Sequence, residues 1–295
     1  MDANSILTVD KLKIITLVEN SPKYDSYFMG CFGISFWIEI ESNGCKKTIL
    51  FDVGTLPEVA IHNAELMGLS FSDIDMIILS HCHFDHTAAL AGILVEIGHD
   101  VPILAHPDIY RPNFTLAPEF LDYSMKGENC KDNIERLGGH YILTKSPIQP
   151  YPGILLTGEI EQTVDFEKLG GVSCYTIDSK GNLVQDRLQD DISLLINVKG
   201  KGLIVLAGCA HAGIINIMEQ SIRQTGIDKI EAVIGGFHLL EAESDRVDKT
   251  LQSLERLSPN WIVPMHCTGL IPTARIATSF PERFKEIHAG DILNF

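Results

Sequence analysis

The sequence lacks the features that would place it at once among membrane or nucleotide-binding proteins. It contains no run of about 18 apolar residues, so no membrane-spanning helix is expected. Neither a GxGxxG nor a Walker pattern occurs, which disfavours a nucleotide-binding loop of either kind. Residues 1–10 carry acidic side chains and no apolar stretch, and therefore do not resemble a secretory signal peptide.

Basic residues and paired cysteines are scarce as well. Lysine and arginine number 23 against 39 aspartates and glutamates, and the net charge of −16 disfavours nucleic-acid binding because an acidic surface repels phosphate backbones. The seven cysteines are odd in number and form no CxxC pair, which favours reduced thiols in the cytoplasm over a disulfide framework. We therefore expect a cytoplasmic protein with a small-molecule substrate and no membrane contact, and homo-oligomerisation stays open.

The share of hydrophobic residues is high enough to form a large core. Hydrophobic types make up 45% of the 295 residues and charged types 21%. Each half of the sequence shows paired strands followed by strand–helix alternation, and no linker divides them. We therefore predict one domain over residues 1–295, of the α/β (α+β layered) class, with helices outside two packed mixed sheets. The predicted strands are 13–18, 34–40, 47–51, 76–79, 102–105, 154–157, 192–198, 203–207, 232–234 and 261–265, and the predicted helices are 59–67, 87–97, 212–225, 245–257 and 273–280.

Residues 110–152 are less regular than the rest of the chain. Prolines and glycines interrupt this segment, and only its part around 128–137 shows a helical pattern. Because long irregular segments in compact domains are often functional, we predict an insertion or lid here, with a merely decorative insertion as the alternative.

Four potential metal ligands lie within the six residues His81–His86, between a predicted buried strand and a predicted helix. Imidazole nitrogens and carboxylates suit zinc, with iron or manganese as alternatives. In an extended turn, side chains alternate, so His81 and His83 face one point while Asp85 and His86 reach a second point nearby. This HxHxDH segment predicts a centre for one or two ions.

Four motifs together resemble those of the metallo-β-lactamase superfamily. Beside HxHxDH, residues 49–54 resemble the first motif, which implies that Asp52 orients the metal-binding loop. His266, after the predicted strand 261–265, resembles the last ligand. Residues 203–209 resemble the strand whose final aspartate bridges two metals, but Cys209 stands there. The resemblance implies an αββα sandwich.

A second departure concerns the histidine that usually precedes strand 192–198. Asp190 and Asp191 stand there instead, and His211 is the candidate replacement ligand, with Cys209 as a further candidate. The pattern Gly-Cys-x-His at 208–211, with GGFH at 235–238 and HCTG at 266–269, resembles one branch of the superfamily. That branch includes the archaeal dihydropterin-methyl ribofuranosylaminobenzene-phosphate synthase.

Further polar residues follow the predicted strands. His238 ends a strand at the rim where His81 lies, which makes it a candidate for proton transfer together with Asp85. His106, which follows the predicted strand 102–105, and Arg111 could together meet a substrate phosphate, with a surface role as the alternative. The residues predicted to bind substrate are Glu19, Asn20, His106 and Arg111.

The expected activity is hydrolysis of a small, possibly phosphorylated substrate by a metal-activated water. The branch resemblance implies a synthase-like transferase as the alternative. A di-iron protein that reduces oxygen or nitric oxide is disfavoured, because its relatives usually carry glutamate at the position of His83 together with a flavin domain. A metal-binding sensor without catalysis is the remaining alternative.

Overall fold

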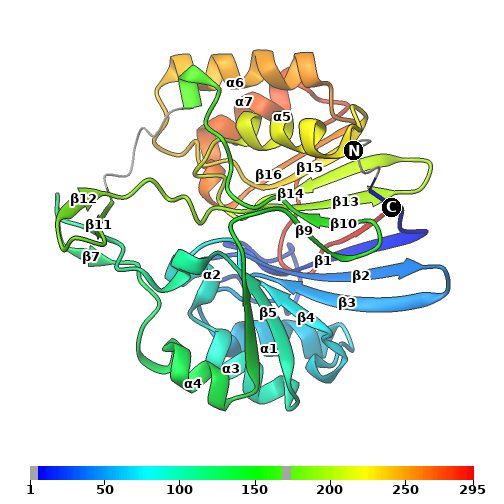
Figure 1. The fold of residues 1–295 in the computed structure, drawn as a ribbon. Coiled ribbons are helices and arrows are strands. Elements are labelled where there is room, and N and C mark those ends of the chain that lie inside the picture. The colour runs from blue at the N-terminus through cyan, green and yellow to red at the C-terminus, as the bar shows by residue number, and fades with distance from the viewer. Residues whose placement is uncertain (1–5, 168–173) are drawn as a thin grey trace.

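The computed structural model describes residues 6–167 and 174–295, so the first five residues of the N-terminal segment discussed above lie outside it. Two large mixed sheets pack against each other with helices on both outer faces (Figure 1). The seven-stranded sheet has the order β17 (Ile292–Asn294), β1 (Lys11–Val18), β2 (Ser35–Ser42), β3 (Cys45–Phe51), β4 (Met76–Ile78), β5 (Val101–Ala105) and β8 (Gly139–Leu143). The six-stranded sheet has the order β16 (Trp261–Met265), β15 (Ile230–Gly236), β14 (Gly202–Leu206), β13 (Leu194–Val198), β10 (Ile154–Leu156) and β9 (Ile148–Tyr151).

Three apolar clusters hold the layers together. One contains inward-facing residues of both sheets, such as Ile38 and Ile204. A second joins the first sheet to α1 (Pro57–Leu66) and α3 (Leu90–Ile97), and a third joins the second sheet to α5 (Ile214–Thr225) and α6 (Ser244–Leu257). The remaining helices are α2 (Phe84–Thr87), α4 (Lys131–Arg136) and α7 (Leu270–Ser279). The predicted αββα sandwich is therefore confirmed.

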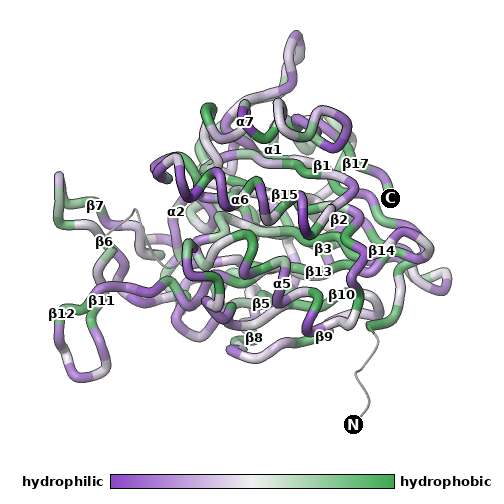
Figure 2. Tube along the Cα trace, turned by 90° about the horizontal axis from the view of Figure 1, so that it is seen from above, coloured by the Kyte–Doolittle hydropathy of each residue, from purple (hydrophilic) through white to green (hydrophobic). Residues whose placement is uncertain are grey.

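The structure adds a third, four-stranded sheet that was not predicted. Its order is β12 (Leu183–Gln185), β11 (Tyr175–Ile177), β6 (Phe114–Thr115) and β7 (Leu121–Asp122). It stands out from one side of the sandwich in both views (Figures 1 and 2). Strands of two or three residues are too short to show a periodic pattern, which explains why they were missed.

The segment predicted as an insertion or lid is divided between the main body and this small sheet. Its first part supplies β6 and β7 of the small sheet. The helix α4 follows, and β8 and β9 then pair within the two large sheets. A role as a lid stays a prediction.

The helix predicted over 87–97 is confirmed as α3 from residue 90 to residue 97, but its predicted start is wrong, because Thr87 ends α2 and residues 88–89 separate the two helices. The backbone N–H of Ala89 donates to the carbonyl of Gly54, and the carbonyl of Asp85 accepts from Ile34. The helical bond between residues 85 and 89 is thus replaced by contacts with distant segments. As predicted, the helix stops at Gly98, which has a left-handed φ of 70°.

Hydrophobic residues gather along the inner strands (Figure 2). None of the described helices has both the length and the apolar character needed to cross a bilayer.

Candidate metal centre

The predicted site residues follow the ends of strands at one edge of the sandwich. Strands β3 to β5 are parallel to one another, as are β14 to β16, so within each sheet the segments that leave these strands meet at the same edge. Asp52 follows β3 and the HxHxDH loop follows β4, while Cys209, His238 and His266 follow β14, β15 and β16. Two sheets thus contribute to one centre.

The HxHxDH loop is held by contacts on both of its sides. Cys82 is fully buried in the apolar cluster of the first sheet, as the alternation of side chains indicates, and its backbone N–H donates to Asp190 at 2.8 Å. His83 precedes the short helix α2, which places Asp85 and His86 in its only turn. The histidines at 81 and 83 consequently point away from the core.

Ligand atoms from three segments, the HxHxDH loop, residues 209–211 and His266, converge inside this edge. One atom each from Asp85, His86, Cys209 and His266 lies within 4.8 Å of all the others, and the same holds for His81, Cys209 and His211. Nε2 of His266 lies 3.0 Å from a carboxylate oxygen of Asp85, and the two Nε2 atoms of His81 and His211 are 3.2 Å apart. The two groups share the Cys209 sulfur, so they adjoin.

The opposite ring nitrogens are fixed by oxygen atoms. Nδ1 of His86 donates to Asp52 at 2.6 Å, and Nδ1 of His266 donates to the amide oxygen of Asn20 at 2.9 Å. The Ser80 hydroxyl donates to Asp52, so it accepts from Nδ1 of His81. With their protons on Nδ1, these rings direct Nε2 lone pairs at one another and at a carboxylate, an arrangement that only a shared proton or a cation stabilises. The residues therefore fit a metal ion.

Burial and neighbouring charges shift the pKa values of the clustered histidines. Burial lowers the pKa of His83 to about 4, and it lowers the pKa of His81 and His211 well below the usual value, assisted by neighbouring imidazoles. Neutral imidazole is the form that binds metal. Burial also acts to lower the pKa of His86, but the carboxylates of Asp85 and Asp52 raise it to about 9. His86 is therefore the ring that holds a proton when no cation balances these carboxylates.

Two predicted residues lie at the margin of the cluster. The ring of His83 lies 4.6 Å from that of His81 and 4.7 Å from that of His211, measured between centroids, but its Nε2 contacts the Asn113 amide oxygen at 3.1 Å. His238 lies against His211, with ring centroids 4.3 Å apart, and is partly exposed. His83 therefore lies beside the converging atoms, and His238 lies on the partly exposed side of His211.

Glu19 and Asn20, which were predicted to bind substrate, form hydrogen bonds with His266 in the structure. Glu19 is buried, and its carboxylate accepts from the backbone N–H of His266 at 3.0 Å, while Asn20 holds the ring of the same histidine. His266 has a left-handed φ of 51°, and these contacts stabilise that conformation. Both residues act on the position of His266.

His106 and Arg111, also predicted to bind substrate, are occupied by acidic partners. Nε2 of His106 lies 3.0 Å from Glu159, and the Arg111 guanidinium pairs at 2.6 Å with both Asp186 and Asp190. Asp190 also accepts a hydrogen bond from the backbone N–H of Cys82 in the HxHxDH loop. Arg111 therefore stabilises this loop through its ion pair with Asp190. Neither side chain joins the converging ligand atoms.

Sequence reasoning missed a row of aromatic rings beside the cluster, formed by Phe32, Phe84 and Tyr123 and here called the aromatic wall. Phe84 lies 5.9 Å from Phe32 and 6.0 Å from Tyr123, between ring centroids. The wall ends at His266 on one side, 5.2 Å from Phe32, and at His83 on the other, 5.1 Å from Tyr123. Only Phe84, inside the HxHxDH segment, carried a sequence signal.

An αββα sandwich with an HxHxDH loop at one edge, and with distant histidines converging on it, is an arrangement of the metallo-β-lactamase type that could hold a metal ion. The family model of the metallo-beta-lactamase superfamily matches residues 30–176. The chain is 43% identical over 289 residues to a Methanocaldococcus jannaschii protein named 7,8-dihydropterin-6-methyl-4-(beta-D-ribofuranosyl)-aminobenzene-5'-phosphate synthase, covering 97% of this chain and 98% of that protein. The chain belongs to the metallo-β-lactamase superfamily, in the branch that contains this synthase.

Two further comparisons add a second relative and a solved structure of similar fold. An uncharacterized protein of the same archaeon is 26% identical over 286 residues, covering 95% of this chain and 99% of the relative. A crystal structure described as a metal-dependent hydrolase of the beta-lactamase superfamily superposes with a TM-score of 0.76, at 22% identity, covering 96% of this chain and 98% of that one. At this identity the likeness supports the fold alone.

Removal of metal is expected to lower the thermal stability of the purified protein. A ligand that binds only the folded state, present at about 100 times its dissociation constant, stabilises a protein by about 2.7 kcal/mol, and for a chain of this size that corresponds to roughly 5–10 °C in Tm. Differential scanning fluorimetry before and after chelation, and after zinc is restored, measures the shift. A protein that loses bound metal without any change in Tm would contradict the coupling of these buried ligands to folding.

Proposed function

We propose that this chain is an enzyme that uses one or two metal ions, with zinc as the first choice and iron or manganese as alternatives. The convergence of ligand atoms within 4.8 Å carries the proposal. A metal ion bound there supplies a Lewis acid that polarises substrate and lowers the pKa of water. The proposed ligands are His81, His83, Asp85, His86, Cys209, His211 and His266.

The surrounding residues position these ligands and move protons. Asp52 keeps the proton of His86 on Nδ1, and Asn20 does the same for His266. Asp85, between His86 and His266, orients the reacting group through its carboxylate. His238, partly exposed beside His211, transfers a proton to or from substrate at an imidazole nitrogen.

We further propose that the reaction joins a dihydropterin to an aminobenzene, the two parts contained in the product that the name of the M. jannaschii relative gives for that protein. The aromatic wall supports this, because its rings border two proposed ligands, and exposed Phe32 and half-buried Phe84 and Tyr123 offer a stacking surface for a planar substrate. In the joining step, the aminobenzene nitrogen forms a bond to the 6-methyl carbon of a dihydropterin. A leaving group departs from that carbon, and the nitrogen loses a proton.

Hydrolysis is the second candidate, and the complete HxHxDH loop favours it. Both reactions displace a leaving group beside the same metal centre, so they differ in whether the aminobenzene nitrogen or water attacks. The cysteines, all seven of which are free thiols, support our proposal of a cytoplasmic location.

Product analysis separates the two reactions. The zinc-loaded protein is incubated with a 7,8-dihydropterin bearing a 6-methyl diphosphate and with 4-(β-D-ribofuranosyl)aminobenzene 5'-phosphate, and the products are identified by mass spectrometry. We expect the joined product in larger amount than 6-hydroxymethyl dihydropterin. If only the hydroxymethyl compound forms, the enzyme is a hydrolase; if neither forms above the zinc-only control, the pterin assignment is wrong.

Phe32→Ala is expected to raise KM for an aromatic substrate about three- to tenfold while leaving kcat within about twofold, since an aromatic pair contributes roughly 0.5–1.5 kcal/mol. Phe32 is 53% exposed, so its truncation should leave Tm nearly unchanged. Phe120→Ala is the matched control, because Phe120 is 64% exposed and its ring contacts Phe114 instead of the wall. Equal KM values for the two variants would remove the wall from the substrate site.

A further inference from the structure

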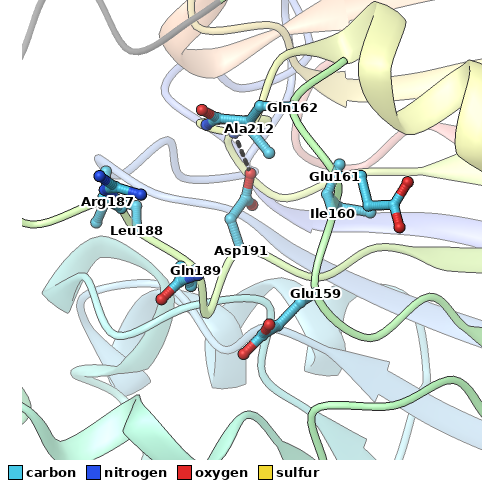
Figure 3. A pocket seen from close by; sticks show the side chains of 9 residues that line it. All are labelled: Glu159, Ile160, Glu161, Gln162, Arg187, Leu188, Gln189, Asp191 and Ala212. Atoms are coloured by element: carbon cyan, nitrogen blue, oxygen red, sulfur yellow. Dashed lines mark hydrogen bonds between the residues drawn. The ribbon is translucent and has the colours of Figure 1, made fainter.

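A cavity of about 270 Å³ is lined by residues of the segments 159–162 and 187–191 and by Ala212 (Figure 3). Ala212, the residue after His211, forms part of its lining. The volume lies near the lower end of the roughly 300–1,000 Å³ typical of small-molecule sites, so it suits one fragment of a substrate. The lining residues are Glu159, Ile160, Glu161, Gln162, Arg187, Leu188, Gln189, Asp191 and Ala212.

Asp191 is the buried polar group of this cavity. Its side chain is central among the lining residues (Figure 3), and the residue is only 1% exposed. Oδ2 accepts from the backbone N–H of Ala212 at 2.8 Å, whereas Oδ1 has no hydrogen-bond partner among the described residues. A buried carboxylate oxygen without a donor is costly, and a ligand N–H that enters the cavity would satisfy it.

Asp191 has no share in the converging ligand atoms. It is absent from both groups of metal-ligating atoms found among the described residues. Asp191 precedes β13, at the position where the superfamily resemblance leads us to expect a metal-binding histidine. This chain therefore has a hydrogen-bond acceptor where the superfamily usually has a metal ligand. The replacement of the expected histidine by aspartate favours a role for Asp191 in binding substrate rather than metal.

We propose that Asp191 binds the amino-amide edge of a pterin ring. This inference rests on the proposed joining reaction. The edge presents an N–H and an adjacent amino group, two parallel donors that match the two oxygens of one carboxylate. Ile160 and Leu188 offer apolar surface to the ring, and the side-chain amides of Gln162 and Gln189 can donate to its carbonyl oxygen.

The other carboxylates of the cavity are less suited to this role. Glu159 is engaged by His106 and by Lys145 at 3.2 Å, and Glu161 is exposed. Glu161→Gln therefore provides a matched control, with one carboxylate of the same cavity neutralised at its open rim.

Equilibrium titrations of the zinc-loaded protein with pterin and with lumazine, followed by ligand fluorescence, test the proposal. Lumazine keeps the two rings but has a carbonyl in place of the 2-amino group. We expect wild type to bind pterin about ten- to a hundredfold more tightly than lumazine, the usual range for a hydrogen bond to a charged group. Asp191→Asn, whose remaining oxygen can still accept from Ala212, should lose this preference and keep its zinc, and Glu161→Gln should retain both.

Each contrary result has a distinct meaning. Equal affinity of wild type for the two ligands, an unchanged preference in Asp191→Asn, or loss of zinc in that variant would overturn the role of Asp191 and leave the joining reaction standing. Failure of wild type to bind pterin at all would overturn the pterin assignment itself.

Discussion

Asp85→Asn is expected to lower kcat/KM by about a thousandfold or more and to reduce the bound metal by up to one equivalent. The substitution keeps the shape of the side chain but removes the charge that lies 3.0 Å from Nε2 of His266 and 3.6 Å from Nε2 of His86. Loss of a metal ion's electrostatic stabilisation is worth several kcal/mol, and each 1.36 kcal/mol is a factor of ten in rate. The nearby histidines hold the pKa of Asp85 below its usual range against the effect of burial, so the wild-type group is a carboxylate.

Steady-state kinetics and metal analysis on the same preparations measure both effects. Asp100→Asn is the matched control, since Asp100 is 82% exposed in its side chain and pairs only with His140 among the ion pairs of the described residues. Wild-type turnover by Asp85→Asn at full metal content would remove Asp85 from the site.

Asp52→Ala is expected to destabilise the protein by about 3–5 kcal/mol, the usual consequence of breaking a buried charged network. Asp52 has no exposed surface and accepts three hydrogen bonds, two from Ser80 and one from His86. It also has a left-handed φ of 56°, which aspartate tolerates better than alanine does. Chemical denaturation of the metal-free variant and wild type measures the difference in the free energy of unfolding.

Asp52→Asn separates positioning from stability. Its oxygen can still accept from Ser80, but its amide would present donors to Nδ1 of His86 and favour the wrong ring tautomer. We expect a ten- to hundredfold loss of zinc affinity, as is usual for groups that orient ligands, with a smaller loss of stability than in Asp52→Ala. Equal zinc affinity in wild type and Asp52→Asn would contradict the tautomer argument.

Much of the fold could be predicted because its signals are local. The short apolar run of β4 and the helical spacing of the apolar residues in α3 each reflect burial that a single segment of sequence displays. The interruption between α2 and α3 could not be read in this way. It depends on the Gly54 carbonyl, which another part of the chain brings to Ala89.

The candidate site likewise has one part that the sequence displays locally and another part that depends on contacts between distant segments. The HxHxDH ligands are neighbours in sequence and were visible as a motif, and the superfamily resemblance pointed to His211 and His266. The contact of Glu19 with His266 spans 247 positions, and Arg111 reaches Asp186 across 75. Strand-end placement suggested substrate binding for both, and only the tertiary structure supplies their actual partners.

The metal content of the purified wild-type protein tests the central claim most directly. After expression in zinc-supplemented medium and removal of loosely bound metal, elemental analysis should find between one and two equivalents of transition metal per chain. The value should fall in Asp85→Asn and stay unchanged in Asp100→Asn. Less than half an equivalent in wild type, with no uptake of zinc, iron or manganese on reconstitution, would contradict the account of this cluster as a metal centre.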